Sequence, residues 1–281
     1  MSGDSYSSKP VILCACGATF YSKDGQQVYG GSAGAGKDSF GVALHRALNG
    51  KLRRVAFADH IKYLAATLDK KDCVLEKDNV IRDMVRSAFS LPENYFWNGK
   101  KDDFGRKLLQ YLGTEVGRSL DPDYWIRSAQ MMIAEKRFYP INEDERNNMI
   151  LHARKLPEPE SGEGIDVIYV SDTRFPNEPE QIEYFAHKEK FPLFLIAEIV
   201  RENYDNGLSE DKRNHLSEQR LTRVMDQPAD YIVYNSSGLK ELDLQAQDIA
   251  RLIAVRKANI LGQEHYVSDV FANESAEERA R

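Results

Sequence analysis

The sequence Gly31-Ser32-Ala33-Gly34-Ala35-Gly36-Lys37-Asp38-Ser39 fits the pattern G-x-x-x-x-G-K and is followed by an amphipathic segment. Glycines in this pattern let successive backbone N–H groups turn toward phosphate oxygens, and the positive end of the following helix faces the same anion. We predict a phosphate-binding loop with the N–H groups of Gly34, Ala35, Gly36 and Ser39 beneath the phosphates and the charge of Lys37 beside them. The alternative is a glycine-rich turn without a chemical role.

The residues before this loop permit two interpretations. A phosphate-binding loop normally follows a buried strand, but the clear apolar run ends at Cys16, and residues 18–30 read ATFYSKDGQQVYG. Either Gln27–Tyr29 is a short strand that leads into the loop, or residues 18–30 form a hairpin inserted between strand and loop.

The residues after Lys37 depart from the plain motif. Asp38 stands where Ser or Thr normally contacts Mg²⁺, and Ser39 follows it. We predict that both lie near a magnesium ion.

Apolar runs rich in β-branched residues alternate along the chain with longer segments of helical spacing, which is typical of an α/β protein with a mostly parallel sheet. The predicted strands are Val11–Cys16, Arg54–Ala58, Val167–Ser171, Leu193–Val200 and Tyr231–Tyr234. The predicted helices are Lys37–Leu48, Ile61–Leu68, Val80–Ala88, Gly105–Leu120, Tyr124–Lys136, Glu178–Lys190 and Leu239–Lys257. Together with the loop, this pattern predicts a three-layer P-loop NTPase fold, in one domain over residues 1–281, with a polar linker at 140–164 and a frayed tail at 263–281.

Composition narrows the function classes. The chain has 281 residues, 42% of them apolar, and a net charge of −6, so no global positive field attracts nucleic acid. No apolar run is long enough to span a membrane, and the first residues do not resemble a leader peptide. The three cysteines lack metal or redox spacing and suit reduced core thiols. We expect a cytoplasmic protein without membrane association.

Charged residues follow two of the predicted strands. Asp172 ends an apolar strand, as does the carboxylate that supports Mg²⁺ in P-loop proteins, and Arg174 two residues later suits bidentate phosphate binding. A rival role for Asp172 is the N-cap of the next helix. Lys62 follows the strand predicted at Arg54–Ala58 and is expected at the carboxyl edge of the sheet, where ligands of open α/β folds bind.

The segment 202–223 is polar and carries many charges of both signs, which predicts a mobile lid; the alternative is a solvated loop with no function. Arg201 precedes this segment, and Arg213 and His215 lie in it. We expect these three residues to close over the phosphates and exclude water. No catalytic base is required of His215, because acceptor phosphate oxygens are already ionised near neutral pH.

Several blocks, in one order over about residues 31–250, resemble the deoxynucleoside monophosphate kinases of bacteriophages, which are related distantly to animal phosphomevalonate kinases. The blocks are Gly36-Lys37-Asp38-Ser39; Phe57-Ala58-Asp59-His60-Ile61-Lys62, where His60 replaces the usual Pro; Arg106 to Glu115 with Asp123-Tyr124-Trp125; Ser171 to Glu178; His215-Leu216-Ser217-Glu218; and Asn235 to Leu239.

This resemblance implies an ATP-dependent transfer of phosphate to a deoxynucleoside monophosphate with Mg²⁺ as cofactor, in a phage-infected cytoplasm. It also implies a helical acceptor region at about 60–136. There Arg106 would hold the acceptor phosphate, Gln110 would reach its base or sugar, and Arg118 would lie near the same helical stripe; a solvated helix face is the alternative for both arginines. Lys62, Arg174 and Glu178 would complete the acceptor site, and Asn235 would lie in the turn that receives adenine.

Two further functions remain open from the sequence. One is a kinase of hydroxymethylated pyrimidine in DNA, which requires a basic groove for the strand; the other is a nucleotide-binding switch protein with no acceptor. The sequence also leaves open which bases are accepted, whether ribose is rejected, and whether the chain forms a homodimer.

Overall fold

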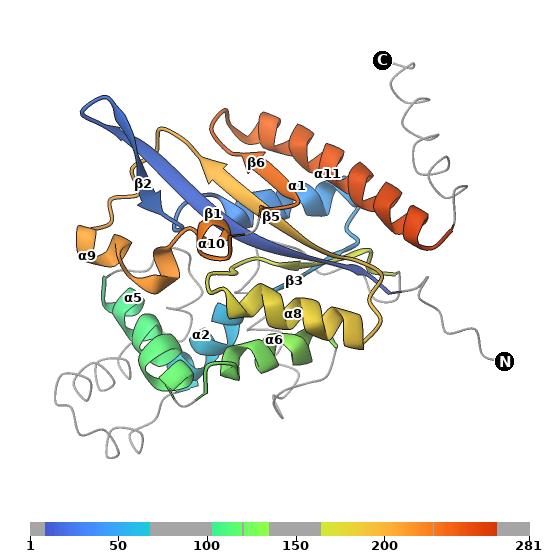
Figure 1. Cartoon of the computed structure of the whole chain (residues 1–281), viewed down its shortest axis with the longest axis horizontal. Helices are drawn as coiled ribbons and strands as arrows, with labels where there is room; N and C mark the ends of the chain where they lie inside the picture. Colours follow the sequence, from blue (N-terminus) through green and yellow to red (C-terminus); the bar gives the residue numbers. More distant parts are fainter. Residues whose placement is uncertain (1–8, 68–102, 120, 135–163, 227, 263–281) are drawn as a thin grey trace. The chain divides into compact units, whose positions relative to one another are not determined.

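The computed structural model describes residues 9–67, 103–119, 121–134, 164–226 and 228–262 (Figure 1). The chain divides into two compact units, one made of Met1–Arg54 with Leu156–Arg281 and the other of Val55–Lys155. Each unit is described by itself. The predicted helix Val80–Ala88, nearly all of the predicted linker and the predicted tail lie outside the described residues.

The first unit contains a mostly parallel sheet of six strands. The strands are β1 (Val11–Lys23), β2 (Gln26–Gly31), β3 (Leu52–Val55), β4 (Val167–Val170), β5 (Phe194–Arg201) and β6 (Tyr231–Tyr234). Their order is β3-β4-β1-β5-β6; β1 pairs in parallel with β4 and β5, β5 pairs in parallel with β6, and β2 pairs antiparallel with β1. The predicted α/β class and mostly parallel sheet are therefore confirmed.

Helices cover both faces of this sheet. On one face α1 (Lys37–Ala47) and α11 (Leu239–Ile260) lie side by side, and α8 (Asn177–Lys188) lies on the opposite face (Figure 1). Alternate residues of β1 enter the core below α1 and α11, together with Phe40, Leu44, Tyr169, Leu242, Ala246 and Ile249. Cys16 faces the other side with Ile196 and Leu221. Burial raises the pKa of Cys16 to about 12 and that of Cys14 further, as expected of inert core thiols.

The order of the strands positions a site. The chain leaves β1, by way of β2 and α1, for β3 on one side, and it leaves β4 by way of α8 for β5 on the other side. Since β1 and β4 are neighbours and their connections diverge, the edge of the sheet where β4 ends beside the middle of β1 is a topological switch point, the place where open α/β sheets bind ligands. Residues 31–37 and 171–174 both lie at this edge.

The segment before the glycines is the inserted hairpin, the second of the two interpretations. β1 continues through Lys23, and β2 returns antiparallel to it as far as Gly31, opposite Thr19. Asp24 and Gly25, with φ of 53° and 77°, form the connecting turn, as a two-residue type I′ turn requires.

The strand predicted at Arg54–Ala58 is wrong in its position. β3 spans Leu52–Val55, and α2 (Phe57–Thr67) begins two residues later in the second unit. A short apolar run fits either a strand or a buried helical turn, so its periodicity alone could not decide between them.

The second unit contains helices. Besides α2, the described elements are α5 (Asp103–Gln110), the π-helix η2 (Tyr111–Arg118) and α6 (Tyr124–Ile133). The single α-helix predicted over Gly105–Leu120 therefore changes type after Gln110. The indole of Trp125 donates to Gly113 O at 2.7 Å, and a Cβ on Gly117 would lie 2.3 Å from its ring. The buried Trp125 thus hydrogen-bonds to a backbone carbonyl of this segment, and its ring leaves room only for a glycine at position 117.

Three short helical turns, α9 (Glu210–Arg213), η3 (Leu216–Glu218) and α10 (Leu221–Val224), lie in the segment predicted as a lid. Over the described ranges, every helix is too short or too polar to cross a membrane.

Candidate functional site

The glycine loop, Gly31–Lys37, joins β2 to α1. Gly34 and Gly36 have φ of 80° and 100°, a left-handed conformation that glycine adopts without strain. Both are also close to neighbouring side chains: a Cβ on Gly34 would lie 2.8 Å from the ring of Tyr204, and one on Gly36 would lie 2.0 Å from the amide of Asn235. The glycines therefore serve the conformation of the loop and its contact with two flanking segments.

Lys37 lies at the start of α1 and bends back into the loop. Its ammonium donates to Ser32 O at 3.1 Å and to Ser32 Oγ at 3.3 Å, directly above Gly17 of β1. Burial, and then the nearby guanidinium of Arg174, lower the pKa of Lys37, while Glu218, Asp38 and Asp172 act in the opposite direction. An arriving polyphosphate would supply the negative charge that favours the protonated lysine.

Arg174 is held at this edge by two carboxylates. Glu178, buried in the first turn of α8, accepts the backbone N–H groups of Arg174 at 2.6 Å and Phe175 at 3.1 Å. Glu218 accepts from the guanidinium at 3.1 Å. Glu178, predicted to bind substrate, is thus engaged with the backbone of the turn and fixes the start of its own helix.

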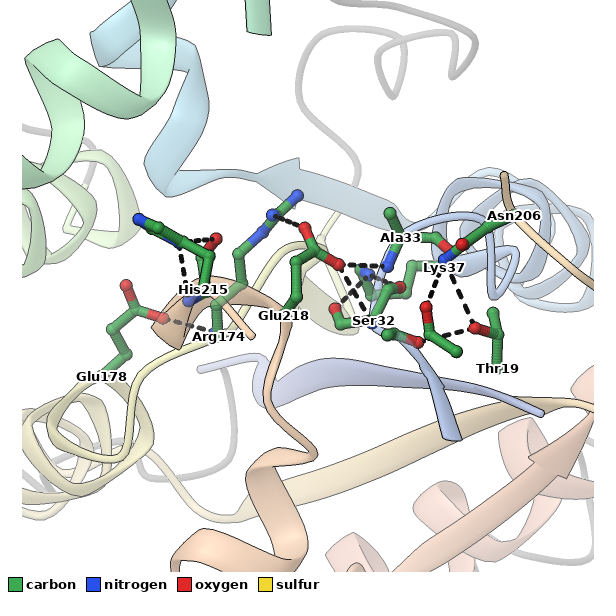
Figure 2. Close-up of polar contacts among 12 residues, drawn as sticks. Thr19, Ser32, Ala33, Lys37, Arg174, Glu178, Asn206, His215 and Glu218 are labelled. Atoms are coloured by element: carbon green, nitrogen blue, oxygen red, sulfur yellow. Dashed lines mark hydrogen bonds and ion pairs between the residues drawn. The ribbon is translucent and has the colours of Figure 1, made fainter. Parts of the chain in front are cut away.

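Glu218 joins Arg174 to the glycine loop. Its second carboxylate oxygen accepts the N–H groups of Ser32 at 3.0 Å and Ala33 at 2.8 Å, so Glu218 lies between Arg174 and the loop (Figure 2). Sequence reasoning assigned Glu218 no role of its own, although Glu218 ends the His215–Glu218 block.

Two of the predicted magnesium ligands, Asp38 and Ser39, lie in the first turn of α1, and the third, Asp172, lies two residues after the end of β4. Asp38 and Ser39 are exposed, and Arg54 Nε lies 3.6 Å from the Asp38 carboxylate. Tyr169 of β4 donates to Lys37 O at 2.7 Å, and its pKa is raised by burial and then by Asp38 and, more weakly, Asp172. Both carboxylates therefore act on Lys37 and Tyr169.

This donor set fits Mg²⁺, which usually binds through one or two carboxylates, substrate phosphates and water. Within the described ranges, no group of three or more His, Cys, Asp or Glu side chains forms a metal cluster. Asp38, Ser39 and Asp172 would accordingly hold the ion only together with phosphate oxygens.

The segment 202–223 contacts the hairpin and the glycine loop. The amide of Asn206 donates to Gly30 O at 2.8 Å and Ala33 O at 3.1 Å, and Tyr204 N donates to Phe20 O at 2.9 Å. Figure 2 shows Asn206 beside the loop on the side away from Arg174. The inserted hairpin thus provides the surface on which this segment rests.

The three residues predicted to close over the phosphates have separate contacts. Arg201 donates to Gly34 O at 3.2 Å and stacks on Tyr204, with its guanidinium carbon 3.7 Å from the ring centroid. Arg213 binds the hydroxyl of Tyr21 and the carboxylate of Asp205, both at 2.7 Å. His215 Nδ1 lies 2.8 Å from Ser217 Oγ within its own turn. Of the three, Arg201 reaches the glycine loop.

Asn235, at the end of β6, supports the loop from the other side. Its amide donates to Ala35 O at 2.8 Å, and Glu202 N donates to Ser236 Oγ in the same turn at 3.0 Å. Asn235 was predicted near adenine; its side chain holds the backbone of the glycine loop.

Four predicted acceptor residues belong to the second unit. Lys62 pairs with Asp59 at 2.8 Å within α2, Arg106 is exposed, and Gln110 lies one α-helical turn after Arg106. Arg118 donates to Pro122 O at 3.2 Å. The prediction that Arg118 shares a helical stripe with Arg106 assumed an α-helix of 3.6 residues per turn throughout. The α-helix ends at Gln110, and a π-helix, which has a different number of residues per turn, continues to Arg118.

Comparison with known proteins gives no match: no family model fits the chain, and no curated protein sequence is significantly similar.

Proposed function

We propose that the chain is an ATP-dependent kinase that converts deoxynucleoside monophosphates to diphosphates. The observation that supports this most strongly is the convergence of the glycine loop, Lys37 and Arg174 at the edge of the sheet where β4 ends beside Gly17 of β1. Two cations beside a helix N-terminus suit a site where two phosphate groups meet.

The donor triphosphate would bind along the glycine loop. The N–H groups of residues 34–39 would face its phosphates, and Lys37 would exchange Ser32 O and Oγ for oxygens of the β- and γ-phosphates. Asp38, Ser39 and Asp172 would hold Mg²⁺, which would supply positive charge against that of the phosphates. Asn235 and Arg201 would keep the loop in its curved form.

The transfer itself needs position and charge more than covalent chemistry. An oxygen of the acceptor monophosphate forms a bond to the γ-phosphorus while the bond from that phosphorus to the bridging oxygen breaks, so the products are a diphosphate and ADP. The attacking oxygen is already ionised near neutral pH, and no side chain has to remove a proton. Arg174 would offset the negative charge between the two phosphates.

The acceptor side rests on the resemblance of the second unit to the phage kinases. Arg106 and Gln110 lie four residues apart on α5, which puts both on one helix face. We propose that Arg106 binds the acceptor phosphate and Gln110 its base or sugar.

Arg174 separates this proposal from a nucleotide switch. A switch protein needs the glycine loop and a strand-end carboxylate but no second cation for an acceptor. Arg174 is held by carboxylates at both its backbone and its guanidinium, so its place beside Lys37 is built into the fold.

The experiment is a transfer assay with labelled ATP and Mg²⁺, in which each common NMP, each dNMP and hydroxymethylated duplex DNA is offered in turn. We expect dNDP formation. ATP binding with no transfer to any acceptor would favour the switch, and transfer to DNA alone would favour the DNA kinase.

A further inference from the structure

Glu218 is a buried carboxylate with donors on both of its oxygens. It is 5% exposed, one oxygen accepts from Arg174, and the other accepts from Ser32 N and Ala33 N (Figure 2). Successive backbone N–H groups that converge on one oxygen form an anion-binding concavity, and charge-assisted bonds of this kind are about twice as strong as neutral ones.

The carboxylate does not compete for the donors assigned to ATP. It uses the N–H groups of Ser32 and Ala33, whereas the phosphates are assigned those of residues 34–39. Arg174 remains 33% exposed, so its guanidinium can bind Glu218 on one side and a phosphate on another. Glu218 therefore orients both partners without occupying the phosphate site.

The hairpin brings Glu218 to this place. Tyr29 of β2 donates its hydroxyl to Glu218 O at 2.7 Å, and Glu218 N donates to His215 O at 2.8 Å. Phe20 of the same hairpin lies 5.5 Å from the guanidinium of Arg220, two residues beyond Glu218. The backbone around Glu218 is thus fixed to an element that directly precedes the glycine loop.

We propose that Glu218 is a positioning residue for phosphoryl transfer, which sets the guanidinium of Arg174 and the start of the glycine loop in register with each other. This inference rests on the proposed kinase function. It gives the inserted hairpin a role: through the Tyr29 hydroxyl, the hairpin holds the backbone of Glu218, which aligns Arg174 of the β4–α8 turn with the phosphate loop.

The test begins with Glu218→Gln. A Gln side chain has one acceptor oxygen, which two loop N–H groups face, so its amide N–H groups would point at the donors of Arg174. We expect kcat to fall by about 10- to 100-fold, the range for one bond to a charged group, while KM for ATP changes by less than about threefold. Glu210→Gln, an exposed site in the same segment, is the control and should leave both constants unchanged.

A double-mutant cycle separates positioning from general stability. If Glu218 acts through Arg174, then Arg174→Ala combined with Glu218→Gln should have a kcat within about threefold of Arg174→Ala alone. Multiplicative losses in the double variant would overturn the inference, as would an unchanged kcat in Glu218→Gln.

Tyr29→Phe is the second variant if Glu218→Gln does not fold. It keeps the carboxylate and removes one bond to the backbone of Glu218, and it should lower kcat severalfold; in that case an unchanged kcat overturns the inference. A wild-type protein that neither binds ATP nor transfers phosphate refutes the kinase and this inference together, whereas an active wild type with independent losses refutes this inference alone.

Discussion

Gly17 supports the glycine loop from below, and Gly17→Ala should displace it. A Cβ at this position would lie 2.8 Å from Ala35 Cβ, 3.0 Å from Ser32 O and 3.0 Å from Lys37 Nζ. Carbon atoms prefer to be about 3.5–4.0 Å apart, so the loop would have to rise by roughly 0.7–1.2 Å at Ala35. Lys37 Nζ can move at the end of its flexible side chain, but Ala35 Cβ and the Ser32 carbonyl move only with the backbone.

Overpacking of this kind costs about 1–3 kcal/mol of unfolding free energy, or about 2–4 °C in Tm for each kcal/mol. A displacement of about 1 Å at the phosphates can lower the rate of transfer by about 10²-fold. Thermal unfolding followed by circular dichroism and the ATP transfer assay measure the two effects. Gly164→Ala is the matched control, because a Cβ there meets no atom within 4 Å and should leave Tm and rate unchanged. If Gly17→Ala matched that control in both measurements, the loop could not lie on Gly17.

Glu198, buried in β5, accepts two hydrogen bonds from Arg220 at 2.8 and 2.7 Å. Glu198→Ala should lower the free energy of unfolding by about 1–3 kcal/mol, because Arg220 is partly exposed and water can hydrate it in the variant. Urea unfolding measures this loss, with Glu180→Ala at an exposed site as the control, and an equal loss in both variants would contradict the prediction. The lowered pKa of Lys37 predicts that ATP affinity falls as pH rises through that pKa, below the ordinary lysine value of about 10.4, and titrations from pH 7 to 10 should give a flatter profile for Lys37→Arg. In the same pH window, Lys37 in the unfolded chain binds more protons than in the folded chain, so its contribution to stability rises with pH. Arg106→Ala should raise KM for the dNMP about tenfold or more and leave KM for ATP unchanged, and steady-state kinetics with the reverse pattern would remove Arg106 from the acceptor site.

Much of the first unit could be predicted from its sequence because its signals are local. The buried strands are continuous apolar runs, and the Asp24–Gly25 pair carries the positive φ values of a hairpin turn. The same information left two interpretations of residues 18–30. The choice between them depends on antiparallel pairing of β2 with β1 and on contacts with residues near 204 and 218, which no local pattern encodes.

The candidate site shows the same limit. Lys37 and Arg174 stand out because their motifs are short in sequence, whereas Glu218 gains its role from donors 186, 185 and 44 residues away. The change from α- to π-helix after Gln110 was also beyond a periodic pattern, since it accompanies the contacts of Trp125 with Gly113 and Gly117. A periodic pattern predicts which face of a helix is apolar. It does not predict that a side chain of the next helix, here Trp125, hydrogen-bonds to a backbone carbonyl of the first.

The central claim is that the glycine loop and Lys37 bind the phosphates of a nucleoside triphosphate. Calorimetric titration of the wild type, Lys37→Ala and Lys188→Ala with ATP and Mg²⁺ tests it most directly, since Lys188 is an exposed lysine of α8. We predict that the wild type and Lys188→Ala bind with equal affinity and that Lys37→Ala binds about 10- to 100-fold more weakly, as expected for loss of one charged donor. Equal affinity in all three proteins, or no binding by the wild type, would contradict the claim.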